Sequence, residues 1–226
     1  MPVDANAPIE VTGFSWVPPF ARGHVRDIRV RWALEEAGKS YRTRLFHAMK
    51  PRPELYFEEQ PFGQVPAYGD GTVQLFESGA IALHIAQDCE TLLPADPAGR
   101  ARATTWVIAA LNSVEPMISE LNTIDVFSAG EEWARLRRPG AEDQIRGRLA
   151  KLGDWLGDKT YLEDDFTVGD LMMASVLRGL DGNPLMDEQP RVARYYAHCI
   201  GRPAFQAALA AQMADFTEEA KEGELA

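Results

Sequence analysis

Hydrophobic and polar residues follow two different periods along the chain, and the change falls near residue 90. Before it, short segments that alternate with a period of two, typical of strands, are separated by stretches with helical spacing. The predicted elements are, in order, a strand at Ile9–Phe14, a helix at Val25–Gly38, a strand at Tyr41–Phe46, a short helix near Glu54–Glu59, a hairpin of Val65–Tyr68 and Thr72–Phe76, and a helix from Ser78.

This order of elements predicts a mixed four-stranded sheet with helices on its faces. The tripeptide Gly69–Gly71 supplies the turn of the hairpin, and Gly38 can take the left-handed conformation that ends a helix. Pro66 stands at the opening of the third strand, where a missing backbone N–H is tolerated. The first part of the chain is therefore predicted to be α+β.

The remainder of the chain reads as all-α. From Ala103 to Ile124, apolar residues recur in steps of three and four, which predicts a long helix with a bend near Pro116. Thr167 and Asp170 have capping-box spacing at the head of a buried helix. We expect a first domain at 1–88, a linker at 89–99 and a helical domain at 100–226.

Composition and charge narrow the classes of function. The chain has 226 residues, 46% hydrophobic and 25% charged, with a formal net charge of −11, which is typical of a soluble globular protein. Such an acidic balance argues against nucleic acid or an anionic membrane as the main partner. No apolar run approaches the ~20 residues that span a bilayer, and no secretory signal is recognisable.

Cysteine and histidine show no metal-ligand or disulfide spacing. The chain has two cysteines, Cys89 and Cys199, far apart in sequence, and we expect both to be inert thiols in a reducing compartment. The prediction is a cytoplasmic protein without a metal ion.

Four sequence elements occur in an order that resembles the cytosolic glutathione transferases of the bacterial type. The most specific one is "QPFGQVPAY…LFESGAI", and the others are "RVRWALEEAG", "FTVGD" and "GRPAF". The resemblance covers nearly the whole chain. It implies a thioredoxin-like first domain that binds glutathione, followed by an all-α helical bundle.

The resemblance also implies the glutathione contacts. The family's proline before the third strand has a cis peptide bond, here Val65–Pro66, which turns the Val65 backbone toward the cysteinyl part of glutathione. Gln64 would bind the peptide from the other side. Ser78, at a helix start that favours an anion, would bind the γ-glutamyl carboxylate, with Glu77 near its ammonium.

The glycyl carboxylate of glutathione needs a cation from the stretch before the third strand. Lys50 is the first candidate and Arg52 the second. Taken singly, a serine at a helix start is most often only a cap, and a proline at a strand start is usually only that. Their occurrence together, at the family's spacing, favours a ligand site.

The group that activates the glutathione thiol is harder to place. Lowering a thiol pKa from ~8.5 to about 6.5 takes roughly 2.7 kcal/mol, more than the ~0.3–1 kcal/mol of a helix N-terminus, so we expect a hydrogen-bond donor. The segment Phe14–His24 is longer than the family's usual connection. Counting from the strand places the family's serine at Ser15, which we prefer; counting back from the helix gives His24, or Arg26 by the cysteine-using branch.

The same long connection is rich in aromatic residues. We hypothesise that it walls the pocket for the electrophile, although its aromatic residues could equally well pack the domains together. The residues assigned to this pocket are Phe14, Trp16, Phe20 and, from the second domain, Trp106.

The function implied is a glutathione transferase that stabilises the thiolate of glutathione and conjugates it to an apolar electrophile. A glutathione-dependent isomerase, dehalogenase or peroxidase, or a non-catalytic binding or regulatory protein on the same fold, remains an alternative. A homodimer is expected, since the family commonly pairs subunits along the helix placed here at Ala103–Ile124.

Overall fold

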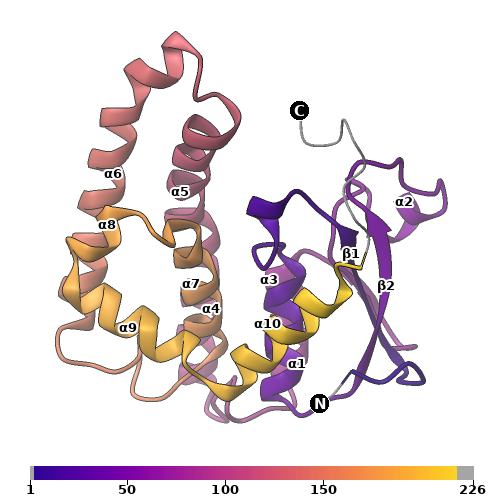
Figure 1. The fold of residues 1–226 in the computed structure, drawn as a ribbon. Helices are drawn as coiled ribbons and strands as arrows, with labels where there is room; N and C mark the ends of the chain where they lie inside the picture. Colours follow the sequence, from indigo (N-terminus) through magenta and orange to yellow (C-terminus); the bar gives the residue numbers. More distant parts are fainter. Residues whose placement is uncertain (1–2, 218–226) are drawn as a thin grey trace. The chain divides into compact units, whose positions relative to one another are not determined.

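The computed structural model describes residues 3–217, which form two compact units (Figure 1). The second unit is Leu93–Gly201, and the first contains the elements up to Leu92 together with the last helix, α10 (Pro203–Asp215). The sequence predicts that everything from residue 100 onward belongs to the helical domain. The difference arises because α10 packs along α1 (Asp27–Glu36).

A four-stranded sheet forms the centre of the first unit, as predicted. Its spatial order is β2-β1-β3-β4, with β1 and β2 parallel and the other neighbours antiparallel. The strands are β1 (Ile9–Trp16), β2 (Tyr41–His47), β3 (Ala67–Gly69) and β4 (Gln74–Phe76).

Helices cover both faces of this sheet. Figure 1 shows α1, α3 (Ser78–Ala86) and α10 on one side and the short α2 (Tyr56–Glu59) on the other. Gly38, with φ +63°, takes the left-handed conformation just beyond α1. The fold is the predicted thioredoxin-like arrangement followed by a helical unit.

The first strand is longer than the sequence indicated. Phe14 pairs with Phe46 and Trp16 with His47, so Ser15 is the extra residue of a β-bulge. The prediction that the strand ends at Phe14, with Ser15 in the following loop, is therefore wrong. The apolar alternation failed here because a bulge interrupts the period of two.

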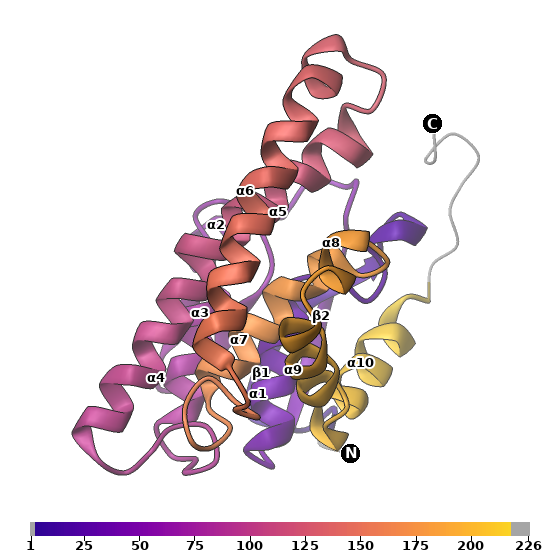
Figure 2. The same ribbon diagram turned by 90° about the vertical axis from the view of Figure 1, so that its left-hand side faces the viewer.

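Consecutive helical segments form a rod in the second unit (Figure 2). A π-helical turn, η2 (Ala110–Val114), ends two residues before Pro116. Proline has no N–H and its ring clashes with the preceding turn, so a wider turn accommodates it. The predicted bend near Pro116 takes this form. The segments are α4 (Pro97–Ala109), η2 (Ala110–Val114), α5 (Glu115–Asn122) and the second π turn, η3 (Thr123–Phe127).

The buried helix α7 (Val168–Leu177) occupies the centre of this unit. The predicted capping box is present: Gly169 N–H donates to Thr167 Oγ1 at 3.1 Å, and Thr167 N–H donates to Asp170 Oδ2 at 2.9 Å. The other elements of the chain are η1 (Pro19–Ala21), α6 (Glu132–Leu156), η4 (Arg178–Leu180), α8 (Pro184–Asp187) and α9 (Pro190–Ile200).

Two properties of residues 3–217 concern membrane spans and metal sites. No helix in this part of the chain is both long and apolar enough to cross a bilayer. The same residues contain no group of three or more His, Cys, Asp or Glu side chains that could hold a metal ion.

Candidate functional site

In the segment before β3, the outer backbone groups form hydrogen bonds with the rest of the described chain, and those of Val65 do not. The Val65–Pro66 peptide bond is cis, and both residues are buried. Gln64 C=O accepts a hydrogen bond from Tyr56 Oη at 2.6 Å, and Ala67 N–H donates to Thr12 Oγ1 at 2.7 Å. Within residues 3–217, no hydrogen-bond partner is seen for the N–H or C=O of Val65.

The start of α3 lies beside a buried arginine. Glu77 has φ +69°, and the helix begins at Ser78, whose side chain is only 5% exposed. The buried Arg29 donates from Nη1 to Ser78 Oγ at 3.2 Å. The first amides of a helix have no partner within it, so they and the guanidinium each contribute positive charge at this place.

The two candidate cations before β3, Lys50 and Arg52, differ in their exposure and in their contacts. The side chain of Lys50 is exposed. Arg52 Nη1 donates to the carbonyls of His47 and Lys50 at 3.0 and 2.9 Å, and its guanidinium lies 4.9 Å from the ring centre of Phe14. Burial lowers the pKa of Arg52. Arg52 therefore stabilises its own loop.

The candidate thiol activators lie on different elements. Ser15 is 9% exposed and its Oγ donates to Phe46 C=O at 3.3 Å. His24 is exposed, and its backbone N–H donates to Ala21 C=O in the turn that follows η1. Arg26 is also exposed and precedes α1.

The predicted aromatic wall is divided between elements. Trp16 is completely buried and stacks on His47 with ring centres 4.7 Å apart, and Phe14 is half-buried under Arg52. Phe20 lies on η1 and is 57% exposed. The structure does not bring these rings together on one loop, because β1 carries two of them.

Trp106 belongs to the second unit. Its indole N–H donates to Glu163 Oε1 at 2.9 Å, and its ring packs on Trp155 with centres 5.3 Å apart. Within its own unit the side chain is therefore held in one orientation.

A buried charged cluster lies on the α1 side of β1, and we name it the arginine cluster: Asp27, Arg31, Gln212 and Asp215. Arg31 donates from Nε to Asp27 Oδ2 at 2.7 Å and from Nη2 to Asp215 Oδ2 at 2.6 Å. Gln212 Nε2 donates to Asp27 Oδ1 at 2.6 Å and to Val25 C=O at 3.1 Å. Both of these partners are acceptors, so only this orientation of the amide fits.

Burial dominates the protonation of the arginine cluster. Complete burial raises the pKa of Asp27, against the lowering caused by Arg31. Burial opposes the charge of Arg31 as well, but Asp27 and Asp215 outweigh it and raise the pKa of the guanidinium. The cluster joins α1 to α10 and lies directly beneath β1.

Comparison with known proteins places the chain in a family. The model "Glutathione S-transferase, N-terminal domain" matches residues 20–87. A glutathione S-transferase of Hyoscyamus muticus is 32% identical over 170 residues, which are 70% of this chain and 79% of that protein. Glutathione S-transferase 1 of Zea mays is 30% identical, over 79% of this chain and 88% of its own.

A solved structure agrees with these matches. The theta class glutathione S-transferase of Xanthomonas axonopodis pv. citri, determined with glutathione bound, is 26% identical, with a TM-score of 0.75 over 90% of this chain and 93% of that one. The fold is that of the cytosolic transferases with a thioredoxin-like first unit. The chain belongs to the glutathione S-transferase family, and its curated relatives are transferases.

Sequence reasoning missed three side chains of the site: Arg29 beneath Ser78, and Thr12 and Tyr56 beneath the Gln64–Ala67 segment. Arg29 had no distinguishing signal, because α1 buries residues all round and carries a second buried arginine, Arg31. Tyr56 lies in the short helix predicted near Glu54–Glu59, within a polar stretch, and its aromatic ring could have indicated packing against the sheet.

Proposed function

We propose that this protein is a glutathione transferase whose glutathione lies along Gln64–Val65 and the start of α3. The Val65 N–H and C=O pair with the cysteinyl backbone of the tripeptide, as a peptide adds to a sheet edge. Ser78 and the first amides of α3 bind the γ-glutamyl carboxylate, Glu77 receives its ammonium, and Lys50 binds the glycyl carboxylate.

The observation that carries this proposal is that the backbone N–H and C=O of Val65 have no hydrogen-bond partner in the described chain. The same unit contains the start of α3, where a buried arginine donates to Ser78. Buried backbone groups are nearly always hydrogen-bonded, so an unpaired pair points to a ligand. Lys50 is favoured over Arg52 as the cation because Arg52 already donates to two carbonyls of its own loop.

Thiolate stabilisation is assigned first to His24 and second to Ser15. His24 is exposed in the turn before α1, whereas the hydroxyl of Ser15 already donates to Phe46 C=O. A hydrogen bond to a charged sulfur contributes about 1.5–3 kcal/mol, enough to supply most of the required pKa shift.

The electrophile is apolar and meets the thiolate beside η1. Phe20 is the aromatic residue of this region with the most exposed ring, and we assign it to the pocket together with Phe14. Trp16 supports the pocket from beneath, because its ring is fully buried against His47.

A homodimer in the cytoplasm completes the proposal. Phe57 and Phe62 are 48% and 67% exposed on the first unit, and the ring of Phe62 lies 6.1 Å from that of Phe76. Such an apolar patch on a surface is typical of a protein interface. Both cysteines are free thiols, which suits a reducing compartment.

The test is calorimetric titration of glutathione into the wild type, Ser78→Ala and the control Ser175→Ala. Ser175 is a buried serine of the second unit whose Oγ donates to Leu171 C=O, so its replacement matches the chemical change away from the site. We expect Ser78→Ala to weaken binding about 10- to 150-fold, the loss of one hydrogen bond to a charged group, and Ser175→Ala to leave it unchanged. Absence of binding to the wild type would overturn the proposal.

Turnover by the wild type with apolar aryl and alkyl halides then separates a transferase from a binding protein. In His24→Ala, the pKa of the bound glutathione thiol, followed by thiolate absorbance against pH, is expected to rise. An unchanged thiol pKa in His24→Ala with a raised one in Ser15→Ala would reassign the activator to Ser15.

A further inference from the structure

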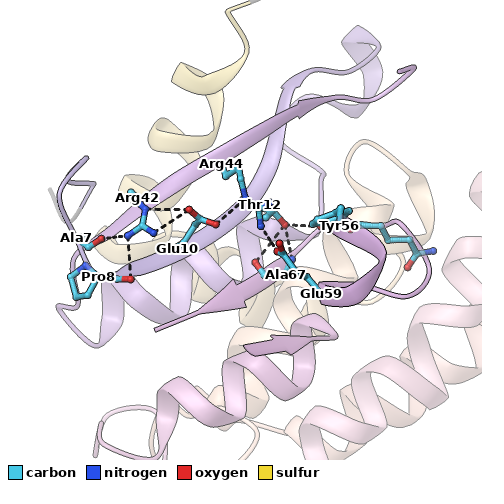
Figure 3. Close-up of polar contacts among 10 residues, drawn as sticks. Ala7, Pro8, Glu10, Thr12, Arg42, Arg44, Tyr56, Glu59 and Ala67 are labelled. Atoms are coloured by element: carbon cyan, nitrogen blue, oxygen red, sulfur yellow. Dashed lines mark hydrogen bonds and ion pairs between the residues drawn. The ribbon is translucent and has the colours of Figure 1, made fainter. Parts of the chain in front are cut away.

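Two hydroxyl groups connect the two ends of the Gln64–Ala67 segment, on the α2 side of the sheet (Figure 3). Ala67 N–H donates to Thr12 Oγ1 at 2.7 Å, Thr12 Oγ1 lies 2.9 Å from Tyr56 Oη, and Tyr56 Oη lies 2.6 Å from Gln64 C=O. We call this set of four groups the hydroxyl relay.

The direction of every hydrogen bond in the relay follows from its ends. Gln64 C=O can only accept, so the proton of Tyr56 points toward it. The Thr12–Tyr56 contact must then use the proton of Thr12. That oxygen in turn accepts from Ala67 N–H, and its 3.5 Å contact to Ala67 C=O is too long to compete. The relay therefore runs one way, from the amide of Ala67 to the carbonyl of Gln64.

Side chains around the relay hold it rigidly. Tyr56 is 1% exposed, and its ring packs on Phe46 with centres 4.6 Å apart and under the guanidinium of Arg44 at 5.5 Å. Arg44 also pairs with Glu59 of α2 and, at 2.8 Å, with Glu10 of β1. Burial raises the pKa of Tyr56, so its hydroxyl remains a donor well above neutral pH.

The relay divides the polar groups of the segment into two sets. It occupies Gln64 C=O and Ala67 N–H, the groups on either side of Val65–Pro66, and leaves the N–H and C=O of Val65 without a partner among residues 3–217. A segment fixed at both flanks holds its central peptide groups in one orientation before a ligand arrives. Preorganisation of this kind reduces the ordering cost of binding.

Resting on the proposed function, we propose that Thr12 and Tyr56 are positioning residues for the peptide backbone of glutathione, acting through Gln64 and Ala67 on the orientation of Val65. Neither hydroxyl touches the ligand. The relay sets affinity for the cysteinyl part of glutathione and leaves the carboxylate contact at Ser78 unaffected.

The first variant is Tyr56→Phe, which removes one hydroxyl and keeps the ring packing. Its matched control is Tyr68→Phe, because Tyr68 is also a buried tyrosine of the first unit and donates to Asp70 Oδ2 at 3.2 Å, outside the relay. We expect the Kd for glutathione to rise about 2- to 13-fold in Tyr56→Phe, the equivalent of one hydrogen bond, and to stay the same in Tyr68→Phe. Thr12→Val should match Tyr56→Phe, and Thr12→Ser should restore binding.

A ligand comparison separates positioning from a general loss of structure. Glutathione methylated at the cysteinyl nitrogen cannot donate to Val65 C=O, so the wild type should bind it less tightly than glutathione. In Tyr56→Phe this difference between the two ligands should shrink, since Val65 is no longer held for either.

The outcomes are distinct. Equal glutathione affinity of wild type and Tyr56→Phe, or an undiminished ligand difference in a folded Tyr56→Phe, overturns the positioning role and leaves the glutathione site standing. Failure of the wild type to bind glutathione overturns the proposed function and this inference with it. If Tyr56→Phe does not fold by circular dichroism, the comparison of Thr12→Val with Thr12→Ser decides.

Discussion

The two faces of β1 carry polar networks of opposite chemistry. On the α2 side, the hydroxyl relay is neutral, and each of its four groups has a partner. On the α1 side, the arginine cluster is charged, and two of its polar atoms, Arg31 Nη1 and Gln212 Oε1, are buried without one. Two consecutive residues of β1 contact the two networks: Thr12 belongs to the relay, and Gly13 lies against the arginine cluster.

This difference indicates that the two networks have different roles in the first unit. The relay links groups close to the proposed ligand, where directional hydrogen bonds between neutral groups set backbone orientation without adding charge. The cluster joins Arg31 to a carboxylate 184 positions later and so fixes α10 against α1. Removal of the cluster should therefore cost stability, and removal of the relay should cost mainly affinity.

The largest effect is expected from Arg31→Met. It leaves Asp27 and Asp215 without their cation in a buried place, and breaking a buried ion pair costs about 3–5 kcal/mol. Urea unfolding should show this loss in the free energy of unfolding. The control is Arg146→Met, whose solvent-screened pairs with Asp143 and Glu188 should contribute far less to stability. Equal losses in the two variants would remove the distinction drawn for the cluster.

Gly13→Ala should have the second largest effect. A Cβ at this position would lie 3.0 Å from Asp27 Oδ2 and 3.1 Å from Arg31 Nη2, so β1 or the ion pair must move. We expect a loss of about 1–3 kcal/mol in the free energy of unfolding. Gly147→Ala is the counterpart: it lies on α6 with nothing within 4 Å and should stabilise by about 0.5–1 kcal/mol. A stable Gly13→Ala would show that the cluster can shift at little cost.

Alkaline pH should lower the free energy of unfolding through Tyr41, whose ring lies against Arg31 of the arginine cluster. Burial raises the pKa of this tyrosine to about 12, so the folded state keeps its proton more tightly than the unfolded chain does. The stabilisation is complete below about pH 10 and falls as the pH rises toward 12, by about 1.4 kcal/mol per unit. Unfolding of Tyr41→Phe against pH should show a shallower fall than the wild type. An unchanged slope in Tyr41→Phe would contradict this assignment.

Thr12→Ser should have the smallest effect. Serine keeps the hydroxyl of the relay and loses only a methyl group, so we expect the free energy of unfolding to change by about 1 kcal/mol or less and glutathione affinity to be unaltered. Thermal unfolding and calorimetry on the same sample test both. A loss of affinity as large as in Thr12→Val would mean that packing of the methyl group, rather than the hydroxyl, orders the segment.

Local patterns were sufficient for most of the secondary structure. The hairpin follows from a glycine-rich turn between alternating runs, the end of α1 from Gly38, and the start of α7 from Thr167 and Asp170. Each of these signals lies within a few residues of the feature it specifies. The same is true of Ser78 at the start of α3, which the sequence placed correctly.

Features that depend on distant partners could not be predicted. Ser15 lies in a bulge whose cause is its pairing with β2, and nothing in its own neighbourhood distinguishes it from a loop residue. The relay joins Thr12 to a tyrosine 44 positions away. Hydrophobic spacing marks a side of α10 as buried, but its contacts with α1, such as those of Gln212 and Asp215, show that it belongs with the first unit.

The placement of α10 has a consequence for how the protein is made. A ribosome releases the sheet and α1 long before α10, with the whole second unit in between, and domains commonly fold in the order of their synthesis. Here the emerging first unit holds a buried arginine and an aspartate whose remaining partners have not yet been translated. We expect this nascent domain to stay incompletely folded until the C-terminal helix leaves the exit tunnel, and a gene fragment that ends after residue 92 to give an unstable product.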